Sequence, residues 1–558
     1  MKWPGKLLLT LLLVIIFTLI SLYAVLQTTW GAAWISRTVT ERTPYHLSVG
    51  KVSHSFSTPS HLILSRVNFG HKGQPASLVA KQIDLGLSLD QLVTPNHFSS
   101  ISLDNGTLKI DDNSPLSSAI NADRLQLNEM AILTPQGIVA SNVTGGIAPW
   151  LPSQEEHAKF RLSAKSVDYA GTQATNVLLQ GSIQQQQIII SDAGADVALG
   201  SVTFNNARRD AQHQWHVSAL RLSDIRWQSD RKLSEFIVPS FPLPAVTFDR
   251  IDVTNARMEG AGWAVNDLDL VLKNATLQDG GWHSNAGSLS MNANTLISGD
   301  ISLTEPIVNL DFTPEGVNIN QLSSRWSKGL IRTSGQWHRA DKKLVLDSLA
   351  IAGIEYTLPK QWREKWMTPL PAWLSAIEVK KIDANRNLLI DINPDFPFQL
   401  TSLEGCGSNL LLARDHQWGV WGGNFQAVAA EATFNRIDLR HPSVTLTADK
   451  EKINISELSA FVNRGILECS VTLSQQPQRD LQLNLSGRQI PPDLLYNWGW
   501  PTVLDSTLSD VQLTLQGNLT AGKSFRDSMN GTLIITANEQ RRQQQLQAGQ
   551  VVTPLVQP

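Results

Sequence analysis

The chain has 558 residues, of which 42% are hydrophobic and 17% charged, and its net charge at pH 7 is −3. This length leaves room for two to four ordinary domains or for one long repetitive domain. The lack of a basic excess argues against nucleic acid as a partner. The two cysteines exclude a disulfide-dense scaffold, a cysteine zinc cluster and a Cys-ligated iron–sulfur cluster.

The N-terminus carries a long apolar run. Residues Leu7 to Leu26 contain no charge, and Lys2 and Lys6 precede them. Twenty helical residues span about 30 Å, the thickness of a hydrocarbon core. Positive charges before the run keep that end cytoplasmic, so residues 1–36 are predicted to anchor an exported chain. The alternative is a cleaved signal peptide ending at Gly31-Ala32-Ala33, but the run is long for one and this site lies late.

The exported part alternates apolar and polar residues with period two. Clear examples lie at 101–103, 268–270, 481–485 and 511–515, and Gly, Asn and Asp separate the runs. Such alternation is typical of antiparallel strands with one apolar and one wet face. Roughly 30 such runs predict an all-β protein. Four short helices are predicted as well, over 319–330, 360–367, 493–498 and 524–529.

Three segments share one template and indicate internal repetition. They begin at Phe98, Phe248 and Phe434, and each has an apolar lead, a strand, a two-residue turn and a return strand; the turns are Asn105-Gly106, Asn255-Ala256 and His441-Pro442. Repeat units of this kind stack because they cannot bury their faces alone. About 30 strands in one sheet would extend roughly 140 Å, and such a sheet must curl or split. We therefore predict a long curled antiparallel sheet that forms a repeating groove with an apolar interior. Two or three closed sandwiches remain the alternative.

Six runs of sequence stand near the two ends of the exported part: Leu47-Ser-Val49-Gly50-Lys51-Val52, Leu62-Ile-Leu64-Ser-Arg-Val67-Asn-Phe69, Ala80-Lys-Gln-Ile83-Asp-Leu85-Gly-Leu87-Ser-Leu89, Ile101-Ser-Leu103-Asp-Asn105-Gly106-Thr-Leu108-Lys-Ile110, Leu513-Thr-Leu515-Gln-Gly517-Asn-Leu519 and Met529-Asn530-Gly531-Thr-Leu533. With these runs, both ends resemble the AsmA-like proteins of Gram-negative bacteria. The amino-terminal likeness covers 47–110 and the carboxy-terminal likeness covers 513–535. Family members usually continue with a glycine-containing strand that ends in an Asp-Leu pair, whereas this chain continues into Arg541-Arg542-Gln543-Gln544-Gln545.

The resemblance suggests a division of the chain. An anchor at 1–36 precedes an AsmA-like amino-terminal β module at 37–150. Middle β-groove modules follow at 151–375, and carboxy-terminal AsmA-like β modules occupy 376–537. A polar, Gln-rich tail at 538–558 ends the chain.

The resemblance also implies a function. Such a protein has a single membrane-spanning helix in the bacterial inner membrane, stands in the periplasm and guides phospholipids toward the outer membrane, where an outer-membrane component is a possible partner. A 16-carbon chain costs about 12 kcal/mol to place in water, so a dry groove would remove this barrier. The alternatives are an outer-membrane protein assembly factor or a structural tether that binds polypeptide by strand addition. The residues assigned to the lipid-binding groove face are Leu103, Leu108, Val253, Leu270, Leu439, Leu483, Leu485, Leu513 and Leu515.

No pattern indicates an enzyme or a cofactor. No His-x-x-x-His or His-Glu-x-x-His spacing stands near carboxylates, and no Gly-x-Ser-x-Gly elbow occurs, so neither a metal site nor catalysis is expected. Gly517 to Ser524 match the phosphate-loop pattern. A nucleotide site would need a full helix after it, and only a short helix is predicted there, so no nucleotide is expected either.

Two further features leave two interpretations each. Cys406 and Cys469 are predicted to form a disulfide because an exported chain meets an oxidising compartment; the alternative is two buried free thiols. Trp362, Trp366 and Trp373 lie among prolines, and they indicate either a short helix packed on a sheet or a lid over a groove. The Pro-rich segment 236–244 is similar, and both segments are candidate module boundaries.

The length of the apolar run predicts that the anchor stays in the mature protein. Amino-terminal sequencing of the protein purified from membranes should find residues that precede Gly31. A mature chain that starts at Trp34 would show instead that the run is a cleaved signal peptide.

Overall fold

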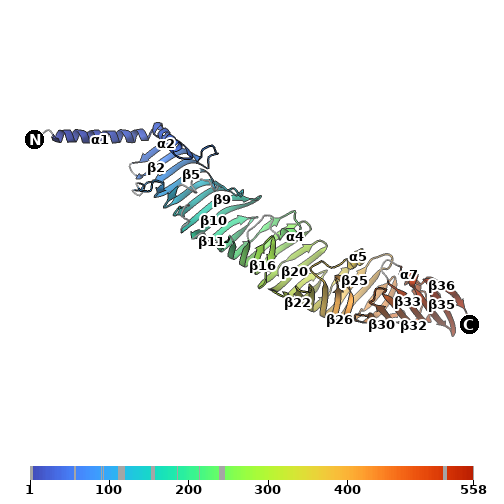
Figure 1. Ribbon diagram of the computed structural model, residues 1–558. Coiled ribbons are helices and arrows are strands. Elements are labelled where there is room, and N and C mark those ends of the chain that lie inside the picture. The colour runs from blue at the N-terminus through green and yellow to red at the C-terminus, as the bar shows by residue number, and fades with distance from the viewer. Residues whose placement is uncertain are drawn as a thin grey trace. The chain divides into compact units, whose positions relative to one another are not determined.

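The computed structural model describes residues 4–55, 58–88, 91, 93–110, 120–151, 157–184, 187–210, 212, 214–237, 245–519 and 524–556. The chain divides into two compact units: unit 1 comprises Met1–Ala261 with Asp267–His283, and unit 2 comprises Gly262–Asn266 with Ser284–Pro558. Each unit is built on a long, curled and mainly antiparallel sheet (Figure 1). The predicted all-β class and curled sheet are therefore confirmed, and the alternative of closed sandwiches is not what the described residues form.

The N-terminal half begins with two helices, which the strands of unit 1 follow in chain order (Figure 1). Its elements are α1 Pro4–Leu26, α2 Thr29–Arg42, β1 Tyr45–Ser55, β2 Thr58–His71, β3 Leu78–Gly86, β4 His97–Phe98, β5 Ser100–Lys109, β6 Asn121–Ala122, β7 Leu125–Leu133, β8 Val139–Ala148, β9 Ala158–Tyr169, β10 Thr172–Gln184, β11 Gln187–Val197, β12 Gly200–Arg209, β13 Trp215–Ser223, β14 Arg226–Gln228, α4 Leu233–Phe236, β15 Val246–Gly260, β16 Trp263–Gln278 and β17 Gly281–His283.

The C-terminal half continues with strands and three short helices. Its elements are β18 Gly287–Asn292, β19 Thr295–Ser298, β20 Ile301–Thr313, β21 Gly316–Trp326, β22 Gly329–His338, β23 Lys343–Ala352, β24 Glu355–Thr357, α5 Trp362–Met367, β25 Ala376–Asp391, β26 Phe398–Arg414, β27 Gln417–Val428, β28 Glu431–Phe434, β29 Ile437–Ala448, β30 Lys452–Val462, β31 Gly465–Ser474, β32 Asp480–Ile490, α6 Leu494–Asn497, β33 Ser509–Asn518, α7 Phe525–Ser528, β34 Asn530–Ala537, β35 Gln540–Gln547 and β36 Gln550–Val556.

Most neighbouring strands are antiparallel, and parallel pairs occur where the chain crosses over. β5 pairs with β7, β13 and β14 pair with β15, and β23 and β24 pair with β25, all in parallel. A parallel pair needs a crossover connection, and short helices lie in two of these connections, α4 before β15 and α5 before β25. The two Pro-rich segments proposed as module boundaries therefore lie in the crossovers that join parallel neighbours; residues 238–244 of the first lie outside the described part of the chain.

Three of the four predicted helices are confirmed as α5, α6 and α7, whereas the helix predicted over 319–330 is wrong. These residues belong to β21 and the start of β22. The register between the two strands shifts between Ile319 and Leu322. Such a bulge inserts one residue into the period-two pattern. Successive inward-facing side chains there are three sequence positions apart, which is a spacing typical of a helix. The Gln-rich C-terminal segment likewise forms strands, β35 and β36.

The two-residue turns predicted at Asn105, Asn255 and His441 are also wrong. Each residue lies inside a continuous strand and has a left-handed backbone, with φ of 48°, 50° and 48°. Asn and His tolerate this conformation better than most residues. In β5 the effect is visible: Leu103 lies before Asn105 and Leu108 after it, five positions apart, yet both side chains are buried. The left-handed residue thus shifts the inward-facing parity by one within a single strand.

The predicted Cys406–Cys469 disulfide is wrong, because both thiols are free. Cys406 lies in β26 and is exposed, whereas Cys469 lies in β31 and is buried. Strands β27, β29 and β30 stand between them in the ladder. Four strand steps correspond to about 19 Å, while a disulfide needs Cα atoms within about 7 Å.

The two thiols are expected to differ strongly in reactivity. Burial raises the pKa of the Cys469 thiol to about 11, so almost none of it is thiolate at neutral pH. A thiol reagent at pH 7.5 should label Cys406 in the native protein and reach Cys469 only after denaturation. Mass spectrometry of both samples without reductant counts the labels on each cysteine. A denatured chain that takes up no label would show that the two cysteines form a disulfide after all.

Candidate functional site

An unbroken row of apolar residues crosses the sheet of unit 1 on one face. Directly paired residues follow one another from β1 through β15, and directly paired residues point to the same side of a sheet. Every member is apolar or glycine. We call this set the first apolar row: Val52, Leu64, Ile83, Leu103, Leu127, Gly145, Leu162, Leu179, Ala193, Phe204, Leu220 and Ile251.

Unit 2 carries an equivalent row from β18 to β33. Its one polar member is Thr333, whose hydroxyl donates a 2.7 Å hydrogen bond to the Ser348 carbonyl and is therefore satisfied. The second apolar row consists of Met291, Val308, Leu322, Thr333, Leu349, Ile382, Gly407, Phe425, Leu446, Ile455, Val471, Leu483 and Leu515.

The two rows are covered to very different extents along their length. In the first row Leu103 and Leu127 are only 1% and 2% exposed, whereas Leu162, Leu179 and Phe204 are half-buried. Most of the second row is half-buried in the same way. Apolar side chains that line up on a sheet face without full cover are unusual in a closed core. The middle of each row therefore leaves room for an apolar ligand.

Helix α2 covers the start of the first row and protects the edge of the sheet. The Leu47 and Val49 amides of edge strand β1 donate hydrogen bonds of 3.2 and 3.1 Å to the hydroxyls of Thr40 and Ser36. These bonds satisfy backbone groups that an edge strand would otherwise leave open. The same helix packs Ala32 into the apolar cluster beneath it.

A cavity of about 340 Å³ lies between α2 and the first apolar row. Ile35 and Val39 of α2 form one wall, and Leu64, Ile83 and Leu103 of the row form another. Its lining is almost entirely apolar, and its volume falls in the range of small-molecule sites. No sequence pattern indicates this cavity, because it depends on how α2 packs on the sheet.

The structure places the predicted groove residues on this apolar face but in separate clusters. Leu439, Leu483, Leu485, Leu513 and Leu515 join one cluster in unit 2, next to Leu494, Leu495, Trp500 and Leu504 from the β32–β33 connection. Leu103 and Leu108 belong to the cluster under α2, and Val253 borders a third cluster. Leu270 of β16 is half-buried. Sequence reasoning missed the β8–β13 part of the first row, because left-handed residues such as Asn142, Asn176 and Asn206 interrupt the alternation there.

The Trp-rich segment packs onto the sheet. Trp362 donates a 3.0 Å hydrogen bond from Nε1 to Asp391, and Trp366 stacks on Trp418 with ring centroids 5.4 Å apart. Leu370 and Leu374 join the apolar cluster below. Of the two interpretations of this segment, the structure shows the short helix packed on the sheet, although Trp373 is 59% exposed.

The opposite, polar face carries charged pairs. Lys343 and Glu378 form one across β23 and β25, and Lys380 and Asp347 form another. On β15 the Arg250 side chain hydrogen-bonds Asp252 and lowers the pKa of that carboxyl.

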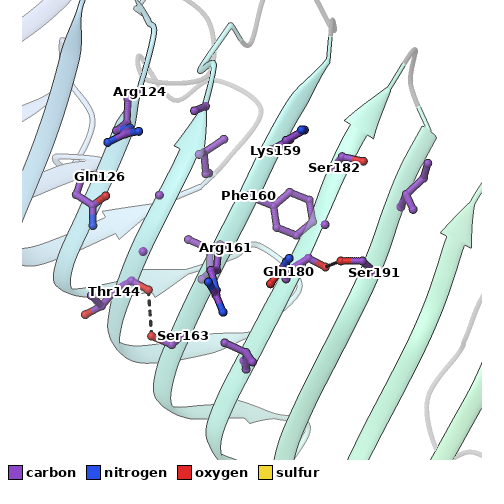
Figure 2. Close-up of a pocket in the computed structure, with 18 residues that line it drawn as sticks. Arg124, Gln126, Thr144, Lys159, Phe160, Arg161, Ser163, Gln180, Ser182 and Ser191 are labelled. Atoms are coloured by element: carbon purple, nitrogen blue, oxygen red, sulfur yellow. Dashed lines mark hydrogen bonds between the residues drawn. The ribbon is translucent and has the colours of Figure 1, made fainter.

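A hollow of about 690 Å³ interrupts this pattern across β7 to β11 (Figure 2). Arg124, Lys159 and Arg161 line it, and among the residues that the structure describes no carboxylate does. Among its polar groups, Ser163 donates to the Thr144 carbonyl at 3.2 Å and Ser191 donates to the Gln180 carbonyl at 3.1 Å. Gln126 donates to Asn128 Oδ1 at 3.4 Å, and the Thr144 hydroxyl accepts from the Glu129 amide at 3.3 Å. We call this hollow the basic trough.

Other candidate chemistry is sparse. His216 pairs with Asp249 at 3.1 Å on the exposed face. Within the described ranges no group of three or more His, Cys, Asp or Glu side chains is placed to hold a metal ion. Residues 520–523 of the phosphate-loop match, Lys523 included, lie outside the described residues. The helix that follows them, α7, has only four residues.

Over the residues described, the two N-terminal helices meet the length and hydropathy of a membrane span only when they are taken together. Among the described residues no single helix combines the length and hydropathy of a span, but Leu12–Val25 and Thr29–Arg42 together do, with an 81° bend between them. Between Leu12 and Val25, most apolar side chains of α1 that the structure describes are exposed, and Phe17 is 72% exposed.

Comparison with known proteins identifies one curated relative. The protein is 45% identical, over 558 residues, to the Escherichia coli (strain K12) protein named AsmA family protein YicH, and the match covers 98% of each chain. No family model matches the chain. No solved structure matches it either. The resemblance to AsmA-like proteins is thereby confirmed.

Truncating covered and uncovered members of the first row should have different costs. Leu127→Ala removes a side chain that is 2% exposed and should destabilise unit 1 by about 2–5 kcal/mol. Leu179→Ala removes a half-buried one and should cost about 1 kcal/mol. Urea unfolding followed by Trp fluorescence measures both. Equal costs would mean that the β9–β13 face is as tightly covered as the face under α2.

Proposed function

Because the chain belongs to the AsmA family, we propose that it is an inner-membrane protein whose exported sheets carry phospholipid acyl chains toward the outer membrane. The observation that supports this most directly is the pair of apolar rows. Each row stays apolar across successive strands while its middle members remain half-buried. A face of this kind suits a ligand that slides along it better than one held in a closed pocket.

The length of the rows suits transport rather than storage. The first row crosses twelve strands, which at ~4.8 Å per strand step corresponds to about 50 Å. An acyl chain could therefore move along it by many small steps. Each step exchanges one set of apolar contacts for an equivalent set, so the cost of about 12 kcal/mol for water exposure never arises.

The N-terminal helices would join the start of the first row to the membrane. Trp30 and Trp34 stand one helical turn apart on α2 and are 81% and 62% exposed, on the face turned away from Ala32 and Val39. Tryptophan is enriched at membrane interfaces. With α1 as the anchor, the bend after it would lay α2 along the membrane surface. The apolar cavity behind α2 would then receive the lipid that leaves the bilayer.

Binding of polypeptide by strand addition is less well supported. Within the described part of the chain, β36 pairs only with β35 and is the free edge at the C-terminal end. However, Pro554 lies within β36 and has no N–H to donate to an added strand. At the other end α2 already satisfies part of the β1 edge.

A photo-crosslinking residue tests the proposal directly. At position 483 it should capture phospholipid in cells, because Leu483 lies in the second apolar row; at position 482 it should not, because Gln482 is exposed on the other face. Lipid is identified by mass spectrometry of the crosslinked protein. Absence of lipid at 483, 179 and 204 together would overturn the proposal.

The same pair of positions gives a transfer assay with a matched control. Leu483→Asp places a charge on the apolar face at a cost of several kcal/mol and should block lipid transfer between membranes. Gln482→Asp should be nearly silent. The unfolding midpoint of each variant shows whether a loss of transfer comes from a blocked lipid path or from an unfolded protein.

A further inference from the structure

We propose that the basic trough on the polar face of unit 1 is a binding site for a phosphate group. It lies across β7, β8, β9 and β10, on the face opposite the first apolar row. The inference is thus independent of the proposed lipid path.

Strand register explains why the face is hollow here. Gly146 of β8 lies directly between Gln126 of β7 and Arg161 of β9. Ala148 pairs with Lys159 in the next row. At these two positions β8 thus presents almost no side chain between the side chains of β7 and β9, which form the two walls of the trough. A Cβ at Gly146 would lie 3.0 Å from the Gln126 Oε1 atom. Two strand steps leave about 10 Å between the walls, which suits a phosphate group.

Within the described ranges, no acidic side chain offsets the charge of the trough. Arg124, Lys159 and Arg161 line it without a carboxylate, and none of the three forms an ion pair with another described residue. Some strand cations elsewhere pair with acidic neighbours on adjacent strands, as in Lys380–Asp347 and Arg325–Glu305. Around this hollow three cations gather without such a partner among the described residues, in a chain whose net charge is −3.

The trough offers the groups that phosphate prefers. Two guanidinium forks can each hold two oxygens of one phosphate, and the Lys159 ammonium adds a point charge. Gln126, Gln180 and Ser182 line the same hollow and carry further donors. Figure 2 shows these side chains on neighbouring strands, with Lys159 and Arg161 on the central one. Leu178 and Ile189 add apolar surface beside the cations, so the phosphate could be free or part of a lipid headgroup.

Inorganic phosphate is the first probe. The full chain, purified in dodecyl maltoside, is titrated with phosphate and followed by ³¹P line broadening. The double variant Lys159→Ala with Arg161→Ala should weaken binding by about tenfold or more, since each removes a charge-assisted hydrogen bond. Lys165→Ala is the matched control: Lys165 is exposed and lies further along β9, two residues beyond Ser163, the last β9 residue that lines the trough. It should change affinity less than twofold.

A soluble short-chain phosphatidic acid distinguishes the source of the phosphate. Binding much tighter than that of inorganic phosphate, and lost in the double variant, assigns the trough to a lipid headgroup. Equal binding of both probes assigns it to free phosphate. If neither probe binds the natural protein, or if the double variant binds as well as Lys165→Ala does, the site does not exist. The unfolding midpoint of each variant confirms that it is folded.

Discussion

Cross-strand register is the constraint on which the rest of this structure depends. Side chains alternate between the two faces of a strand, so a slip of one residue would move every apolar group to the wet face. In both units the pairing instead brings an apolar residue opposite an apolar residue through strand after strand. The apolar rows and their clusters follow from this one regularity, as does the basic trough on the reverse face.

Left-handed residues inside the strands maintain that register in a sheet that curls. Asn105 of β5 and Glu129 of β7 stand at the same level of a parallel pair and have φ of 48° and 53°. On each strand the inward-facing parity changes there, from Leu103 to Leu108 and from Leu127 to Met130, and all four side chains are buried. Because neighbouring strands shift together, the apolar face stays continuous through the bend. Asn is well suited to such positions since its side chain tolerates the left-handed region.

Cover of the apolar face is local, and this matters for function. Helix α2, the connection that contains α5 and the connection that contains α6 each close a stretch of the sheet with a few large side chains. These clusters give each unit stability, since burial of apolar area drives folding. Between them the face is only half-buried. A sheet that is closed at intervals and open elsewhere can be stable as a protein and still present apolar surface to a lipid.

The sequence alone determined the fold class, because period-two alternation is a local property that any strand with one wet face must show. It also identified the family from runs near both ends, and it placed three of the short helices. It did not determine where the parity shifts, so the strand over 319–330 looked helical and Asn105 looked like a turn. Only the tertiary structure decided that Leu103, Leu179 and Phe204 belong to one row, because their alignment depends on pairing between distant segments. It also decided that Cys406 and Cys469 stand four strands apart, and that Arg124 and Arg161, 37 positions apart in the sequence, meet around one hollow over Gly146.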